Sequence, residues 1–204
     1  MADTAVTGTA IIANHYQNEN CHPDGKIKIG IAADSAWRSE RLENAKRLFA
    51  GARRANVPIV HVRLAVPPDY NGVVANTALI REWIELGAWQ EGTWGVEFVA
   101  GLEPMQNESI VTHARNSAFY ESALGEVLAS LGIRHLICCG VSTTYAVEGT
   151  VRHATDMGYR VTVAADACST ATQQQHEASL NAMRALAEIK TVAELLSEFH
   201  SAAD

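Results

Sequence analysis

Short apolar runs alternate along the chain with longer amphipathic segments. The first run, Gly8 to Asn14 (GTAIIAN), predicts a buried strand, and residues 38–56 carry apolar side chains at helical spacing. A β-branched run from Val57 to Leu64 then predicts a second strand. Further strands are expected at 109–112, 133–139 and 159–164, and further helices at 117–131, 143–157 and 173–187. Strands that alternate with helices predict parallel crossover connections.

Several of the expected strands, such as 133–139 and 159–164, are apolar on both faces, which is typical of a parallel sheet covered by helices on both sides. We therefore expect an α/β fold, a three-layer α/β/α sandwich with a mostly parallel sheet, formed as one domain by residues 1–204. The stretch 67–104 departs from this pattern because it holds Pro67-Pro68, Asn71-Gly72 and three tryptophans. It is expected to be a long functional excursion with one short helix at 78–86.

Composition narrows the classes of function. The chain has 204 residues, 48% of them hydrophobic and 19% charged, which fits one globular domain. The chain has 16 Lys and Arg and 23 Asp and Glu, which gives a formal net charge of -7, and it has no basic run. Because nucleic-acid binding needs a basic surface, no nucleic-acid partner is expected. No segment approaches the roughly 20 apolar residues of a membrane span and no leader pattern is visible, so we expect no membrane partner and a cytoplasmic location.

The four cysteines do not form a recognisable metal or disulfide pattern. They stand at 21, 138, 139 and 168, without zinc-ligand spacing, and are expected to be reduced thiols. Cys138 and Cys139 lie inside an apolar run, where burial raises the pKa of a thiol and makes it a poor nucleophile.

In open α/β sheets, ligands bind beyond the carboxyl ends of the strands, so the segments after each strand are the candidates for a site. Residues 14–18 (NHYQN), 113–117 (HARNS) and 140–146 (GVSTTYA) follow three expected strands. Two of these segments contribute a histidine, His15 and His113. The third begins a helix with hydroxyl residues, and backbone N–H groups at a helix start favour anions or a developing oxyanion.

Several motifs extend over nearly the whole chain in a fixed order. Residues 140–166 read GVSTTYAVEGTVRHATDMGYRVTVAAD, and they are accompanied by Gln17-Asn18, GTWG at 92–95 and SAF at 117–119. From Leu136 to Asp166 the sequence resembles the signature of the isochorismatase-like hydrolases, roughly GVxTxxCVxxTxRxAxxxGYxVxVxxDA. The resemblance implies their fold and hydrolysis of a small molecule, since the family includes nicotinamidases, N-carbamoylsarcosine amidohydrolases and other cysteine amidohydrolases.

Three positions differ from what the resemblance implies for catalysis. The family's nucleophilic cysteine aligns with Ala146, its carboxylate base with His15 and its lysine with His113. Alanine has no group that can attack a carbonyl, so a covalent thioester route is not expected at position 146. True isochorismatases also lack the cysteine and hydrolyse a vinyl ether, but they retain the aspartate.

Histidine exchanges a proton near neutral pH, so His15 and His113 could share the general acid and base roles on a bound water, without a cofactor. In this interpretation the 140–146 turn still forms the family's oxyanion pocket, with its non-proline cis peptide at Val141-Ser142. Two alternatives remain open. The protein could be a catalytically silent relative that binds a ligand or supports an assembly, or His15 and His113 could bind a metal with His22 or His61 as a further ligand.

A substrate pocket is expected to lie around these positions. The candidate lining residues are Trp94, Arg115, Phe119, Val141, Ser142 and Tyr145, with Trp89 as a further aromatic side chain. An aromatic wall favours a cyclic or planar small-molecule substrate, with an amide or vinyl-ether type of bond to be broken. Arg115 could bind a carboxylate or pair with a surface acid. The aromatic residues could equally lie in a subunit contact, because members of the family usually form homo-oligomers, here expected to be dimers or tetramers.

Overall fold

The computed structural model describes residues 7–28 and 36–201. Its centre is a six-stranded sheet in the order β3-β2-β1-β4-β5-β6, in which every neighbouring pair is parallel. The strands are β1 (Thr9–Asn14), β2 (Ile59–Leu64), β3 (Ser109–His113), β4 (His135–Val141), β5 (Arg160–Ser169) and β6 (Glu188–Lys190). β1 and β4, in the middle of the sheet, are buried along their whole length.

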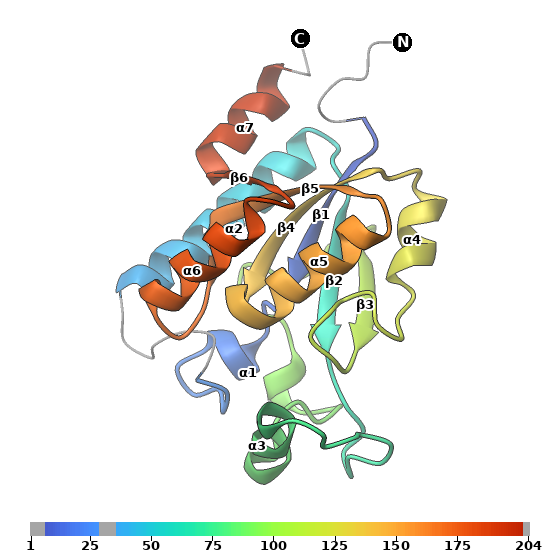
Figure 1. Cartoon of the computed structure of the whole chain (residues 1–204), viewed down its shortest axis with the longest axis vertical. Coiled ribbons are helices and arrows are strands. Elements are labelled where there is room, and N and C mark those ends of the chain that lie inside the picture. The colour runs from blue at the N-terminus through green and yellow to red at the C-terminus, as the bar shows by residue number, and fades with distance from the viewer. Residues whose placement is uncertain (1–6, 29–35, 202–204) are drawn as a thin grey trace.

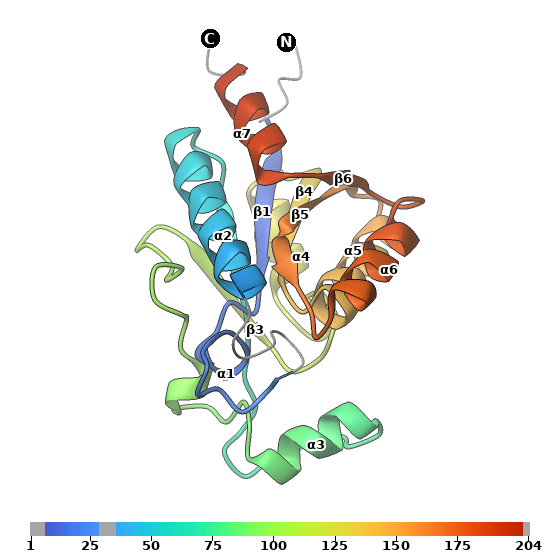
Figure 2. The same cartoon turned by 90° about the vertical axis from the view of Figure 1, so that its left-hand side faces the viewer.

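Helices cover both faces of the sheet and complete the expected three layers. α2 (Ala36–Arg54) and α7 (Val192–Ser201) lie on one face, and α4 (Leu124–Ser130), α5 (Glu148–Asp156) and α6 (Gln173–Met183) lie on the other (Figure 2). The parallel, doubly covered sheet confirms the fold class expected from the sequence. None of the helices in the described ranges has the length and apolar character that a membrane crossing requires.

The stretch 67–104 projects beyond the carboxyl ends of the strands. It contains α3 (Ala78–Leu86), where the sequence places a helix, and the short 3₁₀ segment η1 (Trp94–Val96). Figure 1 shows α3 and α1 (Asn18–Cys21) at the end toward which the arrows of β1, β2 and β3 point. A second apolar cluster, separate from the main core, forms here around Trp83 and Trp89. The excursion therefore closes over the edge of the sheet where ligands bind in such folds.

The largest differences from the sequence-based element boundaries are three. The helix expected at 117–131 begins only at Leu124, because Ala118 donates its N–H to Thr150 Oγ1 and Glu121 adopts a positive φ of 47°, which a helix does not allow. The strand expected to end at Ala164 continues to Ser169. The helix expected to reach Ala187 ends at Met183, and the chain then forms β6 and α7, which the periodicity did not indicate.

Candidate active site

His15 follows directly on β1, and the end of this strand is held in place by buried hydrogen bonds. Asn14 donates from Nδ2 to the Cys139 carbonyl on β4 at 3.0 Å and accepts from Thr150 Oγ1 at 3.3 Å. His15 has a positive φ of 51°, unusual for a residue other than glycine, and its N–H donates to the Val62 carbonyl at 3.0 Å. The backbone is thereby anchored to both neighbouring strands as it turns His15 out of the sheet.

The imidazoles of His15 and His113 meet across the end of β2. His113 is the last residue of β3, and the two Nε2 atoms are 2.6 Å apart. Each residue is only 4% exposed. The structure thus brings together the two histidines that the sequence places after different strands.

The hydrogen bonds define the tautomers of the pair. His113 Nδ1 is 3.0 Å from the Ser117 carbonyl, which can only accept, so Nδ1 carries a hydrogen. In the neutral pair His113 Nε2 accepts from His15 Nε2–H and His15 Nδ1 keeps its lone pair, whereas the Val141 carbonyl, which can only accept, favours the protonated form of His15. The pair therefore presents one basic nitrogen, on His15.

Burial favours the neutral form of both rings. It lowers the pKa of His113 to about 4, opposed by the hydrogen bond to Ser117. Burial, followed by the proximity of His113, lowers the pKa of His15, while the Val141 carbonyl acts in the opposite direction. Both imidazoles are accordingly uncharged at neutral pH, the form that a proton acceptor needs.

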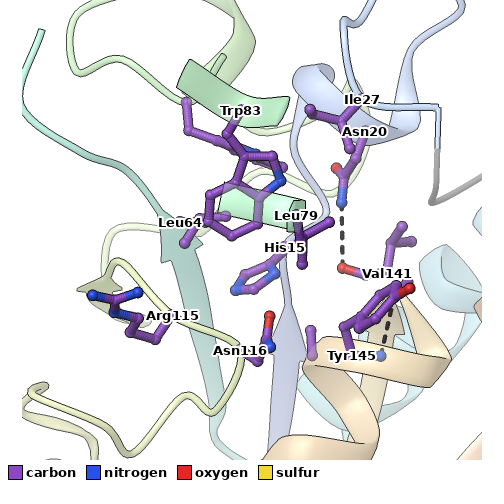
Figure 3. A pocket seen from close by; sticks show the side chains of 13 residues that line it. His15, Asn20, Ile27, Leu64, Leu79, Trp83, Arg115, Asn116, Val141 and Tyr145 are labelled. Atoms are coloured by element: carbon purple, nitrogen blue, oxygen red, sulfur yellow. Dashed lines mark hydrogen bonds between the residues drawn. The ribbon is translucent and has the colours of Figure 1, made fainter. Parts of the chain in front are cut away.

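His15 faces a cavity between the carboxyl edge of the sheet and the excursion (Figure 3). The empty space amounts to about 370 Å³, including the part open to solvent. The lining residues are His15, Asn20, Ile27, Leu64, Leu79, Trp83, Trp89, Arg115, Asn116, Val141, Ser142, Tyr145 and Ala146. Of the residues singled out from sequence, His15, Ala146, Arg115, Val141, Ser142, Tyr145 and Trp89 are among them. His113 is not, and it reaches the cavity only through His15.

Trp94 and Phe119 lie elsewhere, which corrects the expectation that they line the pocket. Trp94 is 46% exposed and packs edge-on against His22, with ring centroids 4.9 Å apart. Phe119 stacks on Tyr159 at 5.8 Å, on the far side of the Ser117 turn. Neither contributes to the cavity wall, because η1 packs on α1 and the delayed start of α4 leaves Phe119 against α5.

The turn after β4 forms the wall opposite α3. Gly140 has a φ of 136°, and a Cβ atom there would lie 2.1 Å from the Asn14 carbonyl oxygen, so only glycine fits. The Val141-Ser142 peptide is cis, as the resemblance implies. The π-helical segment η2 (Thr143–Val147) follows, in which the Ser142 carbonyl accepts from Val147 N–H at 3.0 Å and Ser142 Oγ accepts from Tyr145 N–H at 3.3 Å. Ala146 is buried within this turn and offers no nucleophile.

All four cysteines are free and buried, so none replaces a nucleophile at position 146. Cys138 and Cys139 lie within β4, and burial raises the pKa of both thiols, that of Cys139 to about 12. At neutral pH they are protonated and unreactive.

The additional histidines considered as metal ligands lie away from the pair. His61 is fully buried in β2 and hydrogen-bonds Glu108 Oε2 at 2.8 Å, and His22 packs on Trp94 near the surface. Within residues 7–28 and 36–201, no three His, Cys, Asp or Glu side chains are placed to hold one metal ion. His15 and His113 therefore form a two-residue pair in the described part of the chain.

The sequence model of the isochorismatase domain matches residues 9–194. The chain belongs to the isochorismatase family. Ureidoacrylate amidohydrolase RutB from Variovorax paradoxus is 35% identical over 171 residues, covering 78% of this chain and 68% of that protein. YddQ, an isochorismatase family protein from Bacillus subtilis, is 26% identical over 166 residues, covering 81% of this chain and 80% of its own. A cysteine hydrolase from Pseudomonas syringae pv. phaseolicola shares the fold with a TM-score of 0.86 at 22% identity, over 96% of this chain and 94% of that one.

Within this isochorismatase-family site, sequence reasoning missed several lining residues. They are Asn20, Ile27, Leu64, Leu79, Trp83 and Asn116. Trp83 and Leu79 lie on a helix that the sequence predicts, but which face of that helix meets the sheet edge depends on how the whole excursion folds back. Asn20 and Ile27 lie several residues after β1, and no motif in that segment indicates a contact with the 140–146 turn.

Proposed function

We propose that this isochorismatase-family protein is a small-molecule hydrolase that works without a covalent cysteine intermediate. In this proposal His15 and His113 act as one acid–base pair on a bound water. The observation that carries it is the 2.6 Å contact between the two Nε2 atoms, combined with the place of His15 on the cavity wall.

Other nucleophiles are poorly supported by the lining residues. Ser142 is the one aliphatic hydroxyl among them, and its Oγ accepts from Tyr145 N–H and has no hydrogen bond to His15. A serine nucleophile needs a base within hydrogen-bond reach of its oxygen. A water between His15 and the 141–146 turn meets that requirement without a side-chain nucleophile.

The tautomers define the direction of proton transfer. As water attacks a carbonyl carbon, its proton passes to His15 Nδ1, and the C–O bond forms while the developing oxyanion faces the N–H groups of the turn. The resulting imidazolium is stabilised because its Nε2–H is donated to His113, which can in turn take that proton while Ser117 holds its Nδ1–H. The proton returns to the leaving nitrogen as the C–N bond breaks. A vinyl ether could be hydrolysed by the same pair through protonation followed by addition of water.

The test is turnover of a panel of planar amides, ureides and vinyl ethers by the wild type, His15→Ala, His113→Ala and the double variant. Each single variant should lose about 10²- to 10⁴-fold in kcat/KM, the usual contribution of a positioned acid or base. The double variant should lose little more than either single one, because the two rings act as a unit. His22→Ala, which removes a histidine outside the cavity, is the matched control and should retain full activity.

The variants must remain folded, and we expect their Tm to stay within about 5 °C of the wild type. Full activity in both single variants would exclude the acid–base pair. Absence of turnover of the whole panel by the wild type would favour a silent relative. Loss of activity with a chelator and its rescue by zinc would favour a metal-assisted hydrolase instead.

A further inference from the structure

The cavity and the recess beside it have an unusual distribution of charge. A second, outer recess adjoins the cavity and shares Trp83, Arg115 and Asn116 with it. Among the residues that line either space there is no Asp or Glu, and Arg115 is the one Lys or Arg. The whole chain has a net charge of -7, whereas a wall without acidic side chains does not repel an anionic ligand.

Arg115 stands at the junction of the two spaces with most of its donors unused. Its Nη1 donates to the Val74 carbonyl at 3.2 Å and to Asn76 Oδ1 at 3.4 Å. No acidic side chain in the described ranges lies within ion-pair distance of it. Nε and Nη2 have no hydrogen bond to any of the described residues, and together they form the edge of a guanidinium group that binds a carboxylate through two parallel bonds. This excludes pairing with a described surface acid, one of the two roles that the sequence leaves open.

The Arg115 side chain points away from His15, where the reaction is proposed to take place. Figure 3 shows the guanidinium group pointing away from the His15 imidazole. Its Nη1 is held there by the Val74 carbonyl and Asn76 Oδ1. The other polar groups on the cavity wall are uncharged, since burial keeps His15 neutral. An anionic group on a ligand therefore has Arg115 as its partner, at the end of the cavity away from the base.

We propose that the site takes a small substrate with two parts, an uncharged hydrolysable group beside His15 and a carboxylate that binds Arg115 at the mouth of the outer recess. This inference rests on the proposed function only in taking the cavity as the substrate site. Arg115 is then a residue that determines specificity for anionic substrates, and it takes no part in proton transfer.

Binding of benzoate and benzamide tests the proposal without any need for turnover. The two planar molecules are nearly identical in shape and differ in charge, and Trp83 and Trp89 on the wall supply an intrinsic fluorescence signal. Wild type should bind benzoate at least about 10-fold more tightly than benzamide, the usual strength of a charge-assisted pair. Arg115→Gln should abolish this preference and leave the benzamide affinity unchanged, whereas Arg115→Lys should retain part of it.

Arg81→Gln is the matched control because it removes the same charge from the neighbouring helix. Arg81 is exposed, donates to the Ala75 carbonyl at 3.1 Å and lines neither space. Its substitution should leave the benzoate preference intact. Equal affinity of wild type for the two ligands, an unchanged preference in Arg115→Gln, or the same loss in Arg81→Gln would overturn the proposal.

The binding assay separates this inference from the catalytic proposal. If His15→Ala and His113→Ala keep full turnover but Arg115→Gln loses the benzoate preference, the acid–base pair is wrong and the anion subsite stands. If the histidine variants lose turnover and Arg115→Gln keeps the preference, the anion subsite is wrong and the pair stands.

Discussion

The chemistry of His15 is determined by three neighbours. His113 accepts its Nε2–H, the Val141 carbonyl favours its protonated form, and Trp89 packs against the ring with centroids 6.2 Å apart. Histidine in water has a pKa near 6.5 and is partly charged at neutral pH. Burial changes this by removing water from the charged form, so the pair remains neutral and basic well into the acid range.

The pH dependence of catalysis should report this shift. Both histidines have a pKa below the ordinary value, that of His113 about 4, so the active neutral pair persists as the pH falls through 6.5. We expect kcat/KM to stay constant from pH 8 to about 6 and to fall at lower pH with an apparent pKa that belongs to the coupled pair. The measurement is a pH–rate profile under conditions where circular dichroism shows the protein to be folded. An acid limb centred at 6.5 or higher would contradict the assigned tautomers and burial.

At the scale of elements, the site depends on how the loop after β1 is joined to the excursion. Gln17 donates from Nε2 to the Leu64 and Val96 carbonyls at 2.9 and 2.8 Å and accepts from Leu64 N–H at 2.8 Å. Glu19 is buried, and its two carboxylate oxygens accept from Lys26 N–H at 3.0 Å and Trp89 N–H at 3.2 Å. Since Ile27 and Trp89 both line the cavity, Glu19 positions two of its walls.

Glu19→Gln should loosen these walls. A carboxamide has one acceptor oxygen, so one of the two N–H groups would lose its partner and face an NH₂ group. We expect the free energy of unfolding to fall by about 1 to 3 kcal/mol and KM to rise more than kcat falls, as measured by urea denaturation and steady-state kinetics.

Glu91→Gln provides the control from the same excursion. Glu91 is exposed and pairs with Arg63 at 2.7 Å, so its replacement should cost less than about 1 kcal/mol and leave KM unchanged. An equal effect of the two substitutions would show that Glu19 does not position the cavity.

At the scale of the whole molecule, buried histidines make the free energy of unfolding depend on pH. His113, His135 and His176 each have a pKa of about 4, and burial is the largest cause in every case. Their hydrogen bonds join distant elements: His135 lies between Thr9 and Thr162, and His176 lies against Thr143. The folded pKa is below the unfolded value of 6.5, so this stabilisation is complete above about pH 6.5 and is lost as the pH falls toward 4. A shift of this size corresponds to at most about 3 kcal/mol for His113, and solvent screening makes the contribution of His135 and His176 smaller.

Acid should therefore destabilise the protein well above the pH at which carboxylates are protonated. Near pH 5.5, unfolding should take up roughly one proton for each of these histidines, and each proton adds about 1.4 kcal/mol per pH unit to the slope of stability against pH. Urea denaturation between pH 7 and 5 measures that slope. His135→Gln, which can keep a hydrogen bond to Thr162, should reduce the slope by about one proton. A stability that is independent of pH in this range would contradict the prediction.

The sequence by itself determined the layers of the fold. Short apolar runs without a polar face favour central strands of a covered parallel sheet, and the longer amphipathic segments between them favour covering helices. β6 and α7 gave no such signal. The same pattern fixed where a site can lie, because parallel strands place their carboxyl ends at one edge. Hence the sequence alone predicts that His15, His113 and the 140–146 turn lie at one place.

Only the tertiary structure decided which side chains meet there. The two histidines come within 2.6 Å of each other only in the folded chain. Trp94 and Phe119 do not line the cavity, whereas Asn20, Leu79 and Trp83 do. The fold of the 67–104 excursion and the non-helical turn before Leu124 decide which side chains line it. Neither feature has a repeating pattern, since each follows from contacts between residues far apart in the sequence. That Arg115 has no acidic partner among residues 7–28 and 36–201 is decided in the same way, because the pairing of a charge depends on what packs around it.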